Sequence, residues 1–456
     1  MQNSAILATL EQKFALTPQT AKVLVVGLGA TGVSVARFLH KLGIHFAIAD
    51  SRTKPQSLEA FTKEMPDVPV FTGGFDEAAF QVATHLVVSP GVSLLERSIV
   101  KAVAQGAKII GDIDLFAAAV TEPVIAITGS NGKSTVTTMM GDLLKQAGLK
   151  AGIGGNLGVP ALDLLDQGYE IYALELSSFQ LERTSLLQAA AATVLNVSAD
   201  HLDRHADMAE YAEAKQKVFK GQGTMVINID DPTVNSMQDS TRKTLTFSTN
   251  TTADFHLANR QGSEWLMYKD SELMPLSALP LEGRHNAANA LAALALGMAV
   301  GLDLQTMCNA LRKFKGLAHR MQRVAEIRGV TWVNDSKATN IGACIAALQG
   351  YERKVVLIAG GDAKGADMSE LTPVIKAKAK GVVLMGKDAP LIEQALNGCV
   401  PVVLVKNMVQ AVQAAASLAQ AGESVLLSPA CASLDQYKNY QDRGEKFSNA
   451  VMELLT

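Results

Sequence analysis

An apolar strand that runs directly into a glycine-rich turn and a lysine constrains this chain more than any other feature. Residues 124–127 are apolar and mostly β-branched, which predicts a buried strand. The residues that follow are Thr128, Gly129, Ser130, Asn131, Gly132, Lys133, Ser134 and Thr135. Glycines let backbone N–H groups approach phosphate oxygens, and the start of a helix adds partial positive charge. The pattern predicts a nucleotide-binding loop in which Lys133 contacts the β- and γ-phosphates and Ser134 binds Mg²⁺.

A carboxylate at the end of a later apolar strand supports this interpretation. Glu175 follows apolar residues 172–174, where nucleotide-hydrolysing enzymes carry a Mg²⁺-binding acid. The loop lacks the first glycine of the full motif, because Ile127 occupies that position. An ordinary strand-to-helix turn would not need a Gly-Lys-Ser run, so we favour nucleotide binding. Between the two strands, the glycine-rich residues 152–156 are expected to form a flexible loop.

A second glycine-rich turn lies near the start of the chain. Residues 22–26 predict a strand, and residues 27–32 then have the G-x-G-x-x-G spacing of a Rossmann-type crossover. Asp50 ends the next predicted strand, about 20 residues further on, as that fingerprint requires. The arrangement suits any diphosphate nucleotide, NAD being only one of them. Ser89 follows a later strand and is either a ligand contact or, nearly as well, a plain turn serine.

Acids and histidines follow another predicted strand in the middle of the chain. Residues 200–205 place them near the nucleotide loop, which suggests a metal or phosphate site. For His205 a solvated loop position is the favoured interpretation. The predicted helix 208–220 carries Lys215 and Lys217, and from the residues alone both are most simply surface lysines.

Composition limits the classes of protein that this chain can belong to. A length of 456 residues is too great for one hydrophobic core, so two to four domains are expected. A net charge of −3, from 41 basic and 44 acidic residues, gives no electrostatic case for a nucleic-acid surface. The four cysteines lack C-x-x-C spacing, which fits a reducing compartment. We expect neither a membrane span nor a signal peptide.

The last third of the chain predicts a further α/β unit. Five apolar segments alternate with helical patterns, which indicates a mostly parallel sheet. Polar clusters follow three of these strands, at residues 334–340, 360–364 and 428–433, and suggest a binding face at one sheet edge. Residues 316–320 are expected to act as a hinge. The predicted architecture is three α/β domains with boundaries 1–111, 112–316 and 317–456.

Four segments, taken together and in order, resemble the Mur ligase family over essentially the whole chain. They are residues 128–135, 174–180, 334–340 and 428–436, the last in the form found in D-glutamate-adding members. The resemblance implies a Rossmann-like N-terminal domain, a P-loop NTPase-like central domain and a Rossmann-like C-terminal domain. Ser51 and Tyr440 depart from the family pattern, which has threonine and phenylalanine at these positions.

The resemblance also implies roles for particular residues at the nucleotide ends of the substrates. The diphosphate of a UDP-linked substrate would lie on Gly27, Leu28, Gly29, Ala30, Thr31 and Gly32. The rest of that substrate would contact Asp50, Ser51, Ser89, Asn156 and Ser177. ATP would contact the loop formed by residues 129–135, together with Asn286, Arg320 and Asp335.

Further roles implied by the resemblance concern the reacting groups. Two Mg²⁺ ions would be held by Ser134, Glu175, His201 and Lys215, with Lys215 carbamylated. Lys133, Asn156, His201, Lys215 and Lys337 would serve the chemistry. D-glutamate would contact Thr339, Lys364, Ser433, Leu434 and Tyr440. Lys215 is preferred to Lys217 because the family motif Tyr-x-x-Ala-Lys ends at Lys215.

The implied activity is ATP-dependent addition of D-glutamate to UDP-N-acetylmuramoyl-L-alanine through an acyl phosphate, in peptidoglycan precursor synthesis. A cytoplasmic monomer that acts in cell-wall growth, cell shape and division is expected. An NAD-dependent dehydrogenase would leave the 129–135 loop and Glu175 without a purpose. A non-catalytic nucleotide sensor would need only the binding residues. It gains no support, because every catalytic position of the family motifs is present in this chain. Sibling ligases and folylpolyglutamate synthases remain alternatives of the same class, which a panel of amino acids would separate.

Overall fold

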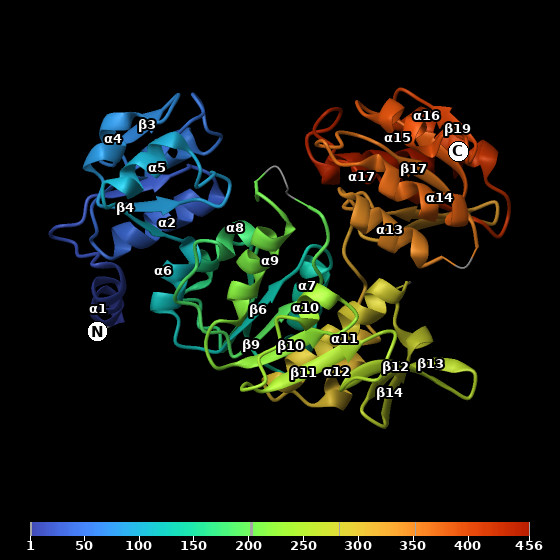
Figure 1. Ribbon diagram of the computed structural model, residues 1–456, viewed down its shortest axis with the longest axis horizontal. Helices are drawn as coiled ribbons and strands as arrows, with labels where there is room; N and C mark the ends of the chain where they lie inside the picture. Colours follow the sequence, from blue (N-terminus) through green and yellow to red (C-terminus); the bar gives the residue numbers. More distant parts are fainter. Residues whose placement is uncertain (1, 201–203, 282, 352, 456) are drawn as a thin grey trace.

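The computed structural model describes residues 2–200, 204–281, 283–351 and 353–455, which form three α/β bodies in chain order (Figure 1). Within these residues, the first body holds a parallel sheet of order β3-β2-β1-β4-β5. Its strands are β1 (Val23–Val26), β2 (Phe46–Asp50), β3 (Val70–Thr72), β4 (His85–Val88) and β5 (Lys108–Ile110). Its helices are α1 (Gln2–Phe14), α2 (Ala30–Lys41), α3 (Leu58–Glu64), α4 (Glu77–Val82), α5 (Arg97–Ala104) and α6 (Asp112–Ala119). The strand order reverses between β1 and β4, where such sheets bind ligands.

The central body is built on a sheet of order β14-β13-β12-β11-β10-β9-β6-β8-β7. The nucleotide loop leaves β6 (Val124–Thr128), whose neighbours are β8 (Ile171–Glu175) and β9 (Ala191–Val194). The other strands are β7 (Ala151–Gly155), β10 (Thr224–Asn228), β11 (Thr244–Ser248), β12 (Phe255–Arg260), β13 (Ser263–Tyr268) and β14 (Ser271–Pro275). β12 is parallel to β11, whereas β13 is antiparallel to both β12 and β14. The helices are α7 (Lys133–Gln146), α8 (Ser178–Leu181), α9 (Met208–Gln216), α10 (Pro232–Asn235), α11 (Arg284–Ala299) and α12 (Leu304–Leu311), with 3₁₀ turns at Ala161–Leu164, Lys217–Phe219 and Leu276–Ala278.

The prediction of a flexible loop at residues 152–156 is wrong, because most of this segment forms the edge strand β7. It pairs in parallel with β8, from Ala151 opposite Ile171 to Gly155 opposite Glu175. The glycines are required by close packing. A Cβ at Gly152 would lie 2.7 Å from the ring of Tyr172. Tertiary packing, which local composition does not reveal, decides the structure here.

The third body holds a sheet of order β15-β16-β20-β17-β18-β19. Its strands are β15 (Gln322–Ile327), β16 (Val330–Asn334), β17 (Val355–Ala359), β18 (Ala379–Leu384), β19 (Val402–Leu404) and β20 (Ser424–Leu427). Only β15, which no sequence pattern predicted, is antiparallel to its neighbour in the described sheet. The helices are α13 (Ile341–Gln349), α14 (Thr372–Lys378), α15 (Ala389–Leu396), α16 (Met408–Leu418) and α17 (Tyr440–Met452), with 3₁₀ turns at Met368–Leu371 and Glu453–Leu455.

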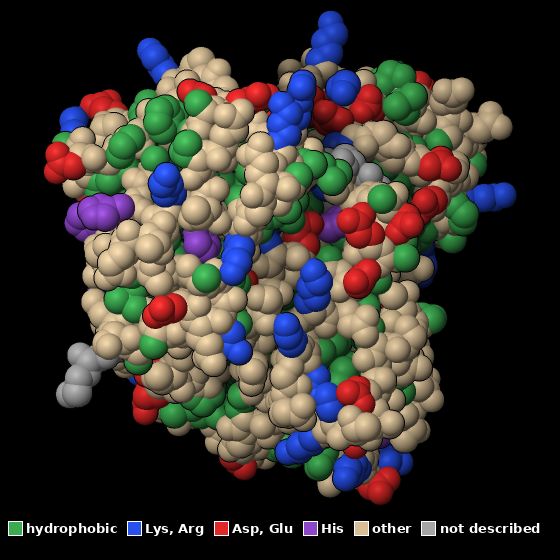
Figure 2. Space-filling view, turned by 60° about the vertical axis from the view of Figure 1, so that its left-hand side comes forward, with side chains coloured by type: hydrophobic (Ala, Val, Ile, Leu, Met, Phe, Trp, Pro, Cys, Tyr) green, Lys and Arg blue, Asp and Glu red, His purple; other side chains and the backbone are tan. Residues whose placement is uncertain are grey.

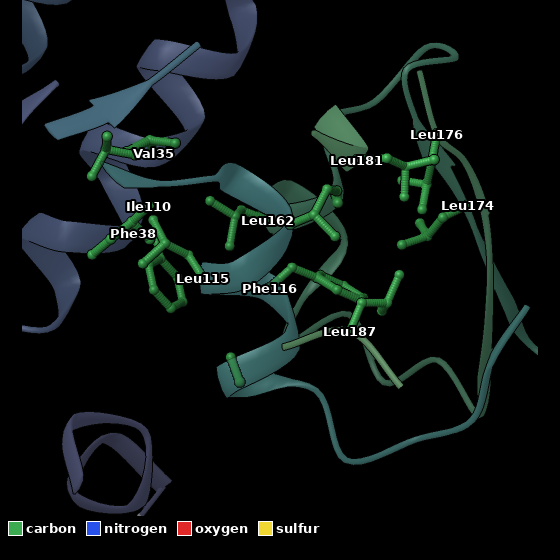
Figure 3. Close-up of a cluster of buried hydrophobic side chains, with 14 of the residues drawn as sticks. Val35, Phe38, Ile110, Leu115, Phe116, Leu162, Leu174, Leu176, Leu181 and Leu187 are labelled. Carbon is green, nitrogen blue, oxygen red and sulfur yellow. The ribbon is translucent and has the colours of Figure 1, made fainter. Parts of the chain in front are cut away.

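The first two bodies share a hydrophobic core, whereas the third has its own. Figure 3 shows one buried cluster that extends from Val35 and Ile110 of the first body to Leu162 and Leu174 of the central body. Side chains of α6 lie between the two pairs. The buried clusters of the third body draw on residues 327–451 alone among the described residues. Separate cores permit relative motion, and a shared one opposes it, because motion would expose apolar surface.

The predicted three-part α/β fold is therefore confirmed, while the domain boundaries stay a prediction. None of the helices in the described part of the chain is long and apolar enough to cross a bilayer. On the face shown in Figure 2, Lys and Arg side chains are interspersed with Asp and Glu, as the near balance of charges suggests.

Candidate active site

The loop between β6 and α7 has the backbone shape that phosphate binding requires. Gly129 and Gly132 have φ angles of 151° and 85°, which favour glycine. A Cβ at Gly132 would lie 2.4 Å from Oδ1 of Asn289, so no larger residue fits. Asn196 holds the turn, since its Oδ1 accepts from the N–H of Asn131 at 2.8 Å and its Nδ2 donates to the Asn131 carbonyl at 3.1 Å. Contacts within the protein thus hold the turn in a shape that leaves its backbone N–H groups suited to phosphate.

Glu175 joins the loop to its surroundings. Its Oε2 accepts from the hydroxyl of Ser134 at 2.5 Å, and its Oε1 accepts from Nδ2 of Asn156 at 2.6 Å. Arg320, from the segment that leads into the third body, donates to the same Ser134 hydroxyl at 2.7 Å. A buried carboxylate beside a hydroxyl provides the hard oxygen ligands that Mg²⁺ prefers, so these residues fit a Mg²⁺ ion.

Two lysines converge on one carbonyl of the loop. Nζ of Lys133 donates to the carbonyls of Gly129 and Ser130 at 2.8 and 2.9 Å. Nζ of Lys215 donates to the Gly129 carbonyl at 3.0 Å and lies 4.2 Å from the ring centre of Tyr211. Burial lowers the pKa of Lys133, and burial followed by the nearby Lys133 charge holds the pKa of Lys215 well below its ordinary value.

The prediction that Lys215 and Lys217 are both surface lysines is wrong for Lys215, which is only 1% exposed. Lys217 is exposed and donates to the backbone carbonyl of Glu182 at 2.7 Å. A signal was present in the sequence. Tyr211, Ala214 and Lys215 stand at helical spacing on one face of α9, and all three are buried.

The prediction that His205 lies in a solvated loop is also wrong. This side chain is 2% exposed, and it stacks on Phe179 with ring centres 5.5 Å apart. Its Nε2 lies 3.1 Å from the hydroxyl of Ser178. Burial lowers the pKa of His205, which favours the neutral ring. His201, expected as a metal ligand, lies outside the described residues.

A cavity of about 300 Å³ lies beside the loop, between the central and third bodies. Predicted residues that line it are Asn131, Gly132, Thr135, Asn286, Arg320, Asp335 and Lys337. Sequence reasoning missed Phe247, His285 and Asn289, for which no local motif gave a signal. Burial raises the pKa of Asp335 to about 7 and lowers that of Lys337 to about 8.

A second cavity, of about 570 Å³, lies where the sheet of the first body reverses its strand order. Predicted residues that line it are Gly27, Gly29, Ala30, Thr31, Asp50, Ser51, Ser89 and Asn156, the last from the central body. Arg52, which sequence reasoning missed, donates to both oxygens of Asp50, at 2.8 and 2.7 Å. Although burial opposes it, hydrogen bonding from Arg52 and the Leu28 N–H lowers the pKa of Asp50 to about 2.

Three of the predicted contacts to this cavity have structural roles instead of lining it. Leu28 is buried in the core, and only its backbone N–H reaches Asp50. Gly32 permits close helix packing, because a Cβ there would lie 1.9 Å from the Gly27 carbonyl oxygen. Ser177 caps α8, its hydroxyl accepting from the N–H of Gln180 at 3.2 Å.

The three polar clusters of the third body lie together, after the adjacent strands β16, β20 and β17. The hydroxyl of Ser428 donates to Oδ2 of Asp335 at 3.0 Å, and Asp362 bridges to Ala432. Near this edge Nζ of Lys337 lies 4.1 Å from the ring centre of Tyr440. Of the other predicted residues, Ser433 is buried, Thr339 is half-buried, and Lys364 and Leu434 are exposed.

Comparisons with known families agree with the three bodies. The model of the Mur ligase MurD-like N-terminal domain matches residues 21–111, the Mur ligase middle domain matches 127–297, and the Mur ligase glutamate ligase domain matches 319–431. A UDP-N-acetylmuramoylalanine–D-glutamate ligase of Methylococcus capsulatus is 54% identical over 95% of this chain and 95% of its own length. One of Nitrosococcus oceani, with the same name, is 49% identical over 97% and 99%.

Solved structures show the same fold at low identity. A pseudomurein peptide ligase type C from Methanothermus fervidus superposes with a TM-score of 0.60 at 18% identity, over 96% of this chain and all (100%) of its own. The UDP-N-acetylmuramate-alanine ligase MurC from Thermotoga maritima gives 0.59 at 18% identity, over 95% and 100%. These likenesses concern the fold.

Proposed function

The chain belongs to the Mur ligase family, and we propose that it joins D-glutamate to UDP-N-acetylmuramoyl-L-alanine with ATP, in peptidoglycan precursor synthesis. The relatives that carry this activity in their names are about half identical to it over nearly their whole length. A cytoplasmic location and a monomeric state stay predictions.

The observation that carries the proposal is the position of Glu175 between the two cavities. Asn156 lines the second cavity and donates to one Glu175 oxygen, while Ser134 of the nucleotide loop donates to the other. Arg320 lines the first cavity and reaches the same serine. A carboxylate held in the second cavity and a γ-phosphate on the loop would therefore meet beside Glu175.

The proposed chemistry has two steps. An oxygen of the L-alanyl carboxylate attacks the γ-phosphorus of ATP, and the bond to ADP breaks. The neutral amine of D-glutamate then attacks the acyl carbon of the acyl phosphate, phosphate leaves, and the nitrogen loses a proton to a base. Activation is needed because a carboxylate oxygen is a poor leaving group. Mg²⁺, when bound, would offset the repulsion between carboxylate and polyphosphate.

Residues of this chain would bind the reacting groups. Lys133 would turn from its loop carbonyls to the β- and γ-phosphates, and Lys337 would face the phosphate that is transferred. Ser134 and Glu175 would hold one Mg²⁺ ion. His201 and a carbamylated Lys215 would hold a second, because a carbamate turns the buried amine into an anionic oxygen ligand. D-glutamate would bind at the edge of the third body, on Thr339, Lys364, Ser433, Leu434 and Tyr440.

Substrate binding should bring the third body closer to the other two. The hinge contains Gly316, at φ 74°, and the third body shares no buried cluster with the others among the described residues. Closure would exclude water from the acyl phosphate. Small-angle scattering should show a smaller radius of gyration with a non-hydrolysable ATP analogue plus UDP-substrate than with neither. An unchanged radius would refute closure.

The pKa of Lys337, lowered to about 8 by burial and Arg320, predicts a pH dependence. Its ammonium loses the proton as pH rises through 8, so kcat/KM for ATP should fall above that pH if positive charge at Lys337 is required. Lys337→Arg, which keeps its charge, should shift this falling limb to higher pH. The same limb in both proteins would show that another group titrates.

Phosphate release tests the proposed function. The enzyme should release phosphate from ATP only when both UDP-N-acetylmuramoyl-L-alanine and D-glutamate are present. An ¹⁸O label in the alanyl carboxylate should appear in the released phosphate, because that oxygen leaves with it. A change of nicotinamide absorbance without phosphate release would instead indicate a dehydrogenase.

A further inference from the structure

Five consecutive backbone carbonyls beside the second cavity accept hydrogen bonds from two arginines of the central body. Arg183 donates through NH1 to the carbonyls of Val88 and Ser89, at 3.0 and 2.8 Å, and through NH2 to that of Val92 at 3.4 Å. Arg204 donates to the two carbonyls between them, at 3.5 and 3.4 Å. Residues 89–92 line the second cavity, so the arginines contact its wall from outside the first body.

We propose that Arg183 and Arg204 form a clamp that positions residues 88–92 and thereby shapes the pocket for the UDP-substrate. Neither arginine would touch substrate, and both would act through the loop. The substrate part of this inference rests on the proposed function, whereas the loop-ordering part does not.

Arg183 is built into the boundary between the two bodies. Its side chain is fully buried, and it is paired with Glu182. Burial lowers the pKa of Arg183, but the Glu182 and Asp112 carboxylates oppose that shift, so the guanidinium keeps its charge. Gly111 leaves room for it, because a Cβ there would lie 3.1 Å from Cγ of Arg183 and 2.9 Å from its carbonyl oxygen.

The clamped loop is coupled to the diphosphate-binding turn. The hydroxyl of Ser89 donates to the Gly27 carbonyl at 3.1 Å, and its N–H donates to the Val26 carbonyl at 2.9 Å. A Cβ at Gly27 would lie 3.0 Å from Cβ of Ser89, so loop and turn are packed together. Movement of the loop would therefore change the shape of the turn.

Arg204 extends the clamp toward the chemistry. Its guanidinium lies 4.5 Å from the ring centre of Phe179. Phe179 lies in α8, which follows Glu175 at the end of β8. Because its distances to the carbonyls are longer and it is only half-buried, we expect it to contribute less than Arg183.

The test compares Arg183→Met, Arg183→Lys and Arg204→Met with the wild-type enzyme. Loss of charged hydrogen bonds should raise KM for the UDP-substrate about 10- to 100-fold in Arg183→Met. The increase should be smaller in Arg204→Met, and Arg183→Lys should recover part of the loss. KM for ATP should stay unchanged, because the first cavity has no contact with the loop in the described residues. Arg37→Met, which removes an exposed ion pair with Glu64 in the first body, is the matched control and should behave as wild type.

Hydrogen exchange separates the clamp from the proposed function. The amides of Ser89 and Val92 should exchange faster in Arg183→Met than in wild type, with or without substrate. Unchanged exchange, or equal increases of all KM values together with a lower unfolding temperature, would overturn the clamp. If the wild-type enzyme binds no UDP-substrate, the proposed function fails, and the exchange comparison still decides the clamp.

Discussion

Lys133→Ala is expected to lower kcat by on the order of 10³-fold or more while leaving the Kd for the UDP-substrate nearly unchanged. In the structure, Nζ of Lys133 is held by two carbonyls of its own loop, Gly129 and Ser130. Lys133 is the first residue of α7, so the variant would lose one of the positive charges that offset the charge of the γ-phosphate. The UDP-substrate would be bound mainly by the first body, which the substitution does not touch.

Calorimetry with the UDP-substrate and a phosphate-release assay measure the two quantities. Lys145→Ala is the matched control, because Lys145 is exposed in the last turn of the same helix. It should keep normal turnover. Loss of UDP-substrate binding together with turnover in Lys133→Ala would show general damage in place of a lost phosphate contact.

Lys215→Ala is expected to lose nearly all activity, whereas Lys217→Ala should lose little. An ordinary lysine has a pKa near ~10.4, so the neutral amine that reacts with CO₂ is scarce at neutral pH. Burial and the Lys133 charge hold the pKa of Lys215 far below that, which makes the neutral form available. Addition of CO₂ to this amine releases one proton and gives a carbamate, which a bound Mg²⁺ would stabilise.

The carbamate can be observed directly. Wild-type protein equilibrated with ¹³C-labelled CO₂ should show a carbamate carbon resonance that Lys215→Ala lacks and Lys217→Ala keeps. Stripping dissolved CO₂ should slow the wild-type enzyme, and returning it should restore the rate. Near-normal turnover in Lys215→Ala would mean that another group supplies the anionic ligand of the second metal.

Features that depend on the local backbone could be predicted from the sequence. The strands expected at 22–26 and 124–127 coincide with β1 and β6 to within one residue. The glycine turns were recognisable because few residues other than glycine adopt their φ angles. The polar clusters could be placed on one edge because the carboxyl ends of adjacent parallel strands meet there.

Features that depend on packing between distant segments could not be predicted from the residues alone. The burial of His205 follows from how the segment before α9 packs on Phe179. The bond from Arg320 to Ser134 joins residues 186 positions apart, and that from Arg183 to Val88 joins residues 95 apart. No local sequence pattern indicates either hydrogen bond, because each forms only when the bodies pack against one another.

This ligase is expected to add D-glutamate and no other amino acid to its UDP-linked substrate. A panel of amino acids tests this specificity most directly. The concentrations of UDP-N-acetylmuramoyl-L-alanine and ATP are held constant, and the mass of the product is measured by mass spectrometry. D-glutamate should support phosphate release and give a product heavier by one glutamate residue. L-glutamate, meso-diaminopimelate, L-lysine and L-alanine should support neither. Product formation with one of these and not with D-glutamate would show that the enzyme is not a D-glutamate ligase.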